Sequence, residues 1–68
     1  MAEHLVNRLK ELRTQADLTQ AELAARVGVS RKTINTIENA VFVPSTLVAL
    51  KLARALGVSV EALFHLEE

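Results

Sequence analysis

Residues 19–39 constrain the fold of this 68-residue chain more than any other stretch. Thr19 and Glu22 have the spacing of a capping box, in which each side chain bonds a backbone N–H group left free at the start of a helix. Ser30 is placed to cap a second helix over about residues 31–39. Gly28 stands between them, and glycine readily takes the left-handed backbone that ends a helix. The sequence therefore predicts two short helices joined by a three-residue turn.

The side chains around this turn favour two helices that cross steeply. Ala24 is small where the helices approach each other, and Val29 and Ile34 are branched apolar residues that fill the wedge between them. A small residue, a glycine four positions later and a branched apolar residue ten positions later have the spacing of a helix-turn-helix. Each element alone is common, but the full string with both caps in register is specific. We therefore expect a helix-turn-helix over about residues 19–39.

The rest of the chain also has a helical period. A first amphipathic helix is expected from apolar residues that repeat every three to four positions, namely Leu5, Val6, Leu9, Leu12 and Ala16. Pro44-Ser45 starts a fourth helix that Gly57 closes, and Ser59 caps a short last helix containing Val60, Leu63 and Phe64. No convincing strand is found. The expected fold class is all-α, a compact five-helix bundle forming one domain over residues 1–68.

Composition excludes several classes of protein. The chain has no cysteine, which removes disulfide-stapled secreted domains, thiolate chemistry and cysteine zinc sites. No apolar run approaches the roughly 20 residues that span a bilayer, so we expect a soluble, cytoplasmic protein with no membrane partner. Eight Lys/Arg balance eight Asp/Glu, which excludes binding of polyanions by bulk charge alone. A local basic surface remains open, because Arg26, Arg31 and Lys32 follow one another with no acid between them.

Nothing in the sequence favours catalysis. His4 and His65 lie near opposite ends of the chain, with no cysteine or acidic cluster beside either that would complete a metal site. There is no nucleophile–base pair and no glycine-rich phosphate loop. We therefore expect no enzyme activity, no metal and no cofactor.

The full pattern resembles the phage-repressor-like (Cro/CI, or XRE-type) helix-turn-helix domains. The resemblance covers about residues 5–66, and it is carried by residues 18–24, 28–30, 33–34, 37–39, 44–45 and 55–59. It implies a five-helix fold whose third helix enters the major groove of double-stranded DNA.

The resemblance combines with side-chain chemistry to suggest DNA-contacting residues. If the third helix buries Ile34 and Ile37, its outward residues are Arg31, Lys32, Asn35 and Thr36. Arginine can bond guanine, asparagine can bond adenine, and threonine can meet a thymine methyl group, so these four are the candidates for base reading. The candidates for phosphate contact are Gln20, Ser30, Thr33 and Asn39. Gln20 also begins a helix, where free amides favour a phosphate oxygen.

The resemblance further implies an ion pair between Arg13 and Glu38 that bridges the first helix to the third. This pair would set the pitch of the third helix without touching bases. The alternative is that these are two unrelated surface charges.

The sequence departs from the family pattern directly after the third helix. Ala40 stands where a glycine usually leaves the helix through a left-handed residue, at an expected cost of about 1 kcal/mol unless Asn39 takes that conformation. Val41 replaces the usual Lys or Arg, which predicts a weaker hold on the DNA backbone. We expect the next residue, Phe42, to fold back onto the core.

These observations predict a sequence-specific DNA-binding transcriptional regulator, a repressor acting as a homodimer on a two-fold operator. The expected dimer surface is the apolar end of the chain, formed by Val60, Leu63, Phe64 and Leu66. Two alternatives remain open. One is a DNA-binding antitoxin or other protein-interaction module, whose partner would be a toxin or another regulator. The other is the DNA-binding part of a longer sensor-regulator.

Overall fold

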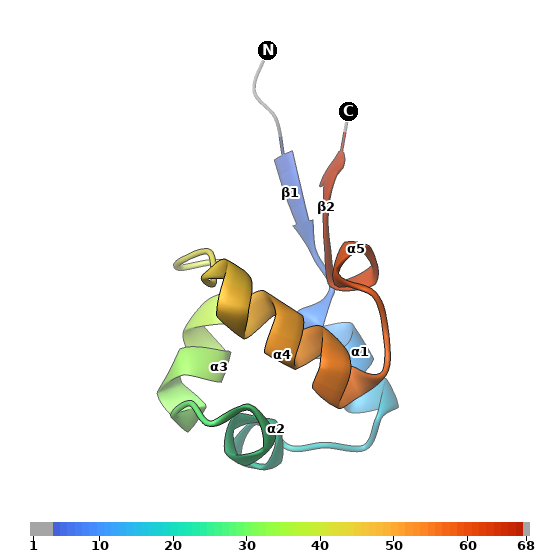
Figure 1. Ribbon diagram of the computed structural model, residues 1–68. Coiled ribbons are helices and arrows are strands. Elements are labelled where there is room, and N and C mark those ends of the chain that lie inside the picture. Colours follow the sequence, from blue (N-terminus) through green and yellow to red (C-terminus); the bar gives the residue numbers. More distant parts are fainter. Residues whose placement is uncertain (1–3, 68) are drawn as a thin grey trace.

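The computed structural model describes residues 4–67, which form five helices and two short strands (Figure 1). Residues 1–3 and 68 of the expected domain lie outside the described part. In chain order the elements are β1 (His4–Asn7), α1 (Leu9–Gln15), α2 (Gln20–Val27), α3 (Arg31–Glu38), α4 (Thr46–Leu56), α5 (Val60–Leu63) and β2 (Phe64–Glu67).

The helix-turn-helix is present as α2, the turn and α3, and both expected caps form. The Thr19 hydroxyl accepts a bond from the Glu22 amide at 3.0 Å, and the Glu22 carboxylate accepts one from the Thr19 amide at 2.8 Å. The Thr19 backbone bond lowers the pKa of Glu22 from its ordinary value. Ser30 accepts a bond from the Thr33 amide at 3.1 Å and caps α3. Gly28 ends α2 with a left-handed backbone, at φ +76°.

The expectation of a purely α-helical fold is wrong at the two ends of the chain. Leu5 and Val6 belong to β1 rather than to the first helix, and Phe64 begins β2 rather than extending α5. The strands pair antiparallel, with Leu5 opposite Leu66. Figure 1 shows them side by side at the end of the molecule far from α2. The fold is therefore a five-helix bundle extended by a two-stranded sheet.

Asn7 explains why the first helix starts later than its apolar period suggested. Its side-chain carbonyl accepts a bond from the Leu9 amide at 3.0 Å, which occupies a free donor at the start of α1. Its amide nitrogen donates to the Ile37 carbonyl at 2.7 Å, which ties the end of β1 to the last turn of α3. Asn7 is the last residue of β1, and its side chain bonds both the start of α1 and the end of α3, so the strand ends and the helix begins within two residues.

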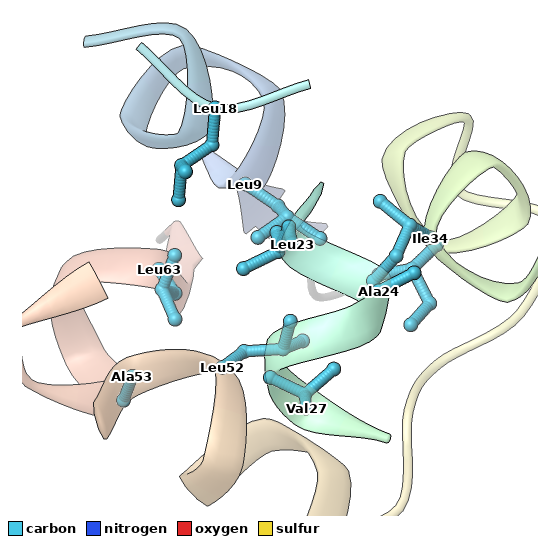
Figure 2. Close-up of a cluster of buried hydrophobic side chains, with 10 residues drawn as sticks. Leu9, Leu18, Leu23, Ala24, Val27, Ile34, Leu52, Ala53 and Leu63 are labelled. Carbon is cyan, nitrogen blue, oxygen red and sulfur yellow. The ribbon is translucent and has the colours of Figure 1, made fainter. Parts of the chain in front are cut away.

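Every helix contributes to one apolar core. The six largest fully buried side chains are those of Leu9, Leu23, Ile34, Ile37, Leu52 and Leu63. Figure 2 shows Leu23, Ala24 and Val27 of α2 lying between Leu52 of α4 and Ile34 of α3. The core therefore fixes α3 by its inner face and leaves the outer face free. Within residues 4–67 no helix is long and apolar enough to cross a membrane.

The end of α3 carries backbone strain, because an alanine takes the left-handed conformation there. Ala40 has φ +58°, whereas Asn39 stays at φ −88°. The Ala40 amide donates to the Ile37 carbonyl at 3.0 Å, and the Val41 amide donates to the Thr36 carbonyl at 2.9 Å. This bond pair is the Schellman motif, in which glycine is the usual left-handed residue.

Ala40→Gly is therefore expected to raise the free energy of unfolding by about 0.5–1 kcal/mol. Glycine removes the steric cost of a left-handed alanine from the folded state. This gain is expected to exceed the loss caused by the greater conformational entropy of glycine in the unfolded chain. Urea denaturation followed by circular dichroism measures the change. The control is Ala16→Gly, at an exposed residue with φ −86°, which should lose stability. Equal losses in both variants would show that Ala40 is not strained.

Candidate nucleic-acid interface

The outer face of α3 presents three exposed polar residues, Arg31, Lys32 and Asn35. They lie within the first five residues of the helix, while Ile34 and Ile37 on the inner face are fully buried. Thr36 lies at the edge of this face. It is half-buried, and its hydroxyl donates to the Thr33 carbonyl at 2.9 Å. Three of the four expected base-reading side chains are thus brought together on open surface, and the fourth has its hydroxyl occupied.

The single acidic residue of α3 is paired with a cation from α1. Arg13 Nε lies 2.6 Å from Glu38 Oε2, and a second guanidinium nitrogen lies 3.2 Å from Oε1. The side chains are 10% and 2% exposed, and the hydrogen bond to Glu38 raises the pKa of Arg13. The third guanidinium nitrogen donates to the Leu18 carbonyl at 2.7 Å. The pair joins α1 to α3, and it leaves the outer face of α3 with cationic and neutral groups only.

A network of side-chain amides extends this ion pair to the surface. Gln20 Nε2 donates to Glu38 Oε1 at 3.1 Å and to Asn35 Oδ1 at 3.2 Å. Asn39 Nδ2 donates to the same Asn35 oxygen at 3.2 Å. The Asn35 oxygen therefore accepts from two side-chain donors, while its own amide N–H groups bond no other described residue. Sequence reasoning missed this network, because Gln20 and Asn35 come together only through the crossing of α2 and α3.

The remaining candidates for phosphate contact are engaged in capping. Ser30 Oγ accepts from the Thr33 amide, and the two hydroxyl oxygens lie 2.9 Å apart. Ser30 is exposed and Thr33 is half-buried. Both hydroxyls lie at the N-terminal end of α3, next to Arg31 and Lys32. A phosphate oxygen that approached this end of the helix would find both hydroxyls already hydrogen-bonded within the cap.

The structure corrects the expected dimer surface and the expected place of Phe42. Leu63 is fully buried, because it is a core residue contributed by α5, and it cannot contact a partner. Val60 and Phe64 are half-buried, and Leu66 is 58% exposed on β2. Phe42 does not fold back onto the core, since it is 44% exposed.

The described part of the chain brings together no group of three or more His, Cys, Asp or Glu residues that could hold a metal ion. His4 and His65, which are near opposite ends of the sequence, lie on the two neighbouring strands of the sheet.

Comparisons with known proteins agree with this geometry. The model of the helix-turn-helix family matches residues 9–63. The chain is 44% identical over 62 residues to YgzD of Bacillus subtilis, an uncharacterised HTH-type transcriptional regulator, covering 91% of this chain and 94% of that one. Among solved structures, the restriction-modification controller protein C.AhdI from Aeromonas hydrophila is 37% identical with a TM-score of 0.76, over 79% of this chain and 82% of the other.

The biofilm master regulator SinR, solved in complex with DNA, is 31% identical with a TM-score of 0.75, over 79% of this chain and 87% of the other. The family match spans the helix-turn-helix, the core helices and both residues of the Arg13–Glu38 pair. This chain therefore belongs to the XRE-type (Cro/CI-like) family of helix-turn-helix transcriptional regulators.

Proposed function

We propose that this regulator is a sequence-specific repressor that binds a two-fold operator as a homodimer, with α3 of each copy in the major groove. The observation that carries the proposal is the outer face of α3. It presents Arg31, Lys32 and Asn35 to solvent, and its only acid is neutralised by Arg13. A helix with this face can approach phosphate-lined grooves without repulsion. The relative SinR, whose structure was solved in complex with DNA, supports the same use of the fold.

The side chains of α3 would divide the reading of bases. Arg31 is an exposed guanidinium that can bond guanine N7 and O6 together, and Lys32 can reach the same acceptors. Asn35 presents N–H donors while its oxygen is held by Gln20 and Asn39, so it can donate to a base acceptor without leaving the network. Bidentate bonding of adenine would require that oxygen and hence release of the two amides. The Thr36 methyl group would meet a thymine methyl.

Contacts to the DNA backbone would come from residues at the two ends of α3 and at the start of α2. Gln20 lies at the first position of α2, and Asn39 follows the end of α3. Ser30 and Thr33 lie at the start of α3. These four residues surround the base-reading side chains, so phosphate contacts there would set the depth and register of α3.

Selection of bound sequences from a random duplex pool tests the proposal. We expect enrichment of a pseudo-palindrome whose half-sites have centres roughly 10–12 bp apart. The reason is that the two α3 helices of a two-fold dimer enter the major groove on the same side of the DNA, about one helical turn apart. A pool that shows no enriched sequence would contradict sequence-specific reading. Enrichment of a single, asymmetric half-site would contradict the two-fold operator.

The salt dependence of binding is expected to be shallow for a dimeric repressor and steeper in Val41→Lys. Val41 is 71% exposed in the loop that follows α3, where a cation could reach a phosphate. Each phosphate that is neutralised changes log K by about 0.9 per decade of salt, so the variant slope should steepen by up to about one unit per subunit. Titrations at several salt concentrations measure it. The control variant Gln15→Lys, at an exposed position of α1, should leave the slope unchanged. The same slope in Val41→Lys as in the parent would place this loop away from the backbone.

A further inference from the structure

Three of the eight basic residues of the chain line one hollow that the proposed function does not use. The hollow has a volume of about 450 Å³ and lies between the second half of α2 and the second half of α4. Its basic residues are Arg26, Lys51 and Arg54, and all three are exposed. The other residues that line it are uncharged. We call this feature the basic hollow.

The basic hollow explains what becomes of a cation that the sequence places beside the DNA-reading residues. Arg26 precedes Arg31 and Lys32 in one run of the sequence without an intervening acid. The structure divides this run. Arg31 and Lys32 lie on the outer face of α3, whereas Arg26 lines the hollow together with the two basic residues of α4.

No acidic group of the described residues neutralises the cations of the basic hollow. The ion pairs within residues 4–67 lie at the start of α1 and between α1 and α3, and none of their members lines the hollow. The acid of α2, Glu22, accepts the Thr19 amide of the capping box at 2.8 Å. Lys51 and Arg54 are three residues apart on α4, so they share a face of the helix, where like charges repel.

The ends of the helices compensate part of this charge but not all of it. Arg26 and Arg54 lie in the last turns of α2 and α4, where a cation interacts favourably with the partial negative charge of a helix C-terminus. That partial charge is roughly half an elementary charge per helix. Two helix ends therefore offset about one of the three formal positive charges, and a net charge of about +2 is left at the basic hollow.

This lining suits a compact ligand with several negative charges. Ligand pockets of about 300–1,000 Å³ are ordinarily lined by apolar and aromatic side chains with few charges. No aromatic residue of the described part lines the basic hollow, so an apolar ligand would find little to contact. A phosphate monoester carries a charge of about −1.5 to −2 at pH 7, which one carboxylate does not reach. Two arginines can each bond a phosphate in two places, and the lysine adds a point charge.

The position of the basic hollow keeps such a ligand apart from DNA. No residue of α3 lines the hollow. In Figure 2 Val27, which lines it, lies on the side of α2 that meets Leu52 of α4, while Ala24 lies toward Ile34 of α3. Val27 is 4% exposed and belongs to the core, so packing fixes the two helices that carry the cations.

We propose that the basic hollow is a binding site for a phosphorylated small molecule with two or more negative charges. Arg26 would hold its phosphate groups from α2, and Lys51 and Arg54 would hold them from α4. A ligand there leaves the outer face of α3 uncovered, so one chain can bind the ligand and DNA together. The site is additional to the proposed DNA contacts and does not depend on them.

Nuclear magnetic resonance on the full chain locates the site, with inorganic triphosphate as the probe. In titrations at constant ionic strength, the amide signals of Ala25 and Ala55 should shift and saturate, with a dissociation constant of about 1 mM or tighter. Acetate, which carries one charge, should give no saturable shift at the same concentrations. Triphosphate shifts that never saturate, or that occur only at Arg31, Lys32 and Asn35, would overturn the proposal.

Two variants on different helices test the cations. Lys51→Glu should raise the dissociation constant for triphosphate about tenfold or more, because it replaces one of three cations by a carboxylate. The matched control is Lys10→Glu, which makes the same charge change at an exposed residue of α1 and should leave binding unchanged. Arg26→Gln, on α2, should weaken binding in the same direction and keeps the test decisive if Lys51→Glu fails to fold. A folded variant of either kind that binds triphosphate as tightly as Lys10→Glu would overturn the proposal.

A titration with duplex DNA separates a small-molecule site from a contact to the DNA backbone. Lys51→Glu should bind the selected operator with the same affinity and the same salt slope as Lys10→Glu, and triphosphate should still shift Ala25 and Ala55 when the operator is bound. Loss of operator affinity in Lys51→Glu, together with displacement of triphosphate by DNA, would make the hollow a backbone contact and overturn the proposal.

The same samples distinguish this proposal from the proposed function. A parent that binds triphosphate in the basic hollow but enriches no DNA sequence would leave the site standing and overturn sequence-specific reading. A parent that enriches an operator and shows no saturable triphosphate binding would support the proposed function and overturn the site.

Discussion

Arg13→Ala is expected to lower the free energy of unfolding by about 3–5 kcal/mol, because it leaves a buried carboxylate without its cation. The Glu38 side chain is 2% exposed and accepts two bonds from Arg13. The variant also removes the donor to the Leu18 carbonyl. The amide of Gln20, which still bonds Glu38, cannot replace a full positive charge. A loss of this size is comparable with the whole stability of a domain this small.

Urea denaturation followed by circular dichroism measures this loss, and two further variants isolate its cause. Arg8→Ala removes the guanidinium of an exposed arginine–glutamate pair, with Glu11, and should change stability little. The double variant Arg13→Met/Glu38→Leu should recover most of the stability, since an apolar pair of similar volume needs no desolvated charge. If Arg13→Ala proved as stable as Arg8→Ala, the ion pair would not hold α1 to α3.

Arg31→Ala is expected to weaken binding of the dimer to its selected operator by about 2–6 kcal/mol. Each half-site loses about 1–3 kcal/mol when a bidentate guanine contact is removed, and the operator has two half-sites. The variant should also lose its preference at one base pair of each half-site. Arg31 is exposed and lies outside the core and the Arg13–Glu38 pair, so folding should be unchanged.

Fluorescence anisotropy at one fixed salt concentration measures the affinity, with single-base variants of the operator to measure preference. The matched control is Arg54→Ala on α4, an exposed arginine that lines a hollow between α2 and α4 and not the outer face of α3. Asn35→Ala should behave like Arg31→Ala, at about 1–3 kcal/mol per half-site. Lys32→Ala and Gln20→Ala should weaken all sequences more evenly. Unchanged affinity and preference in both Arg31→Ala and Asn35→Ala would show that α3 does not read the bases.

Local sequence was sufficient to predict the helix-turn-helix. The bonds that start α2 and α3 join residues three positions apart, Thr19 with Glu22 and Ser30 with Thr33. Gly28 ends α2 through its own backbone freedom. Interactions of such short range require particular residue types at fixed spacings, so they can be recognised in the sequence without knowledge of the fold. The same holds for the polar outer face of α3, because helical period alone separates it from Ile34 and Ile37.

The Arg13–Glu38 pair was predicted, but not from local sequence. No local pattern joins residues 25 positions apart, and the pair was expected only because the chain resembles a family that has it. Its geometry in the structure depends on α1 and α3 packing on the same core residues. Resemblance therefore transferred a contact that short-range reasoning could not derive.

The strands, the amide network and the burial of particular apolar side chains depend on tertiary structure. Leu5 pairs with Leu66 from the other end of the chain, so its apolar period alone could not distinguish a helix from a strand. Gln20 reaches Asn35 only where α2 crosses α3. Leu63 is apolar like Leu66, yet packing buries the first and exposes the second. Short-range bonds and helical period act within a few residues, whereas strand pairing and burial depend on which distant segments close around the core.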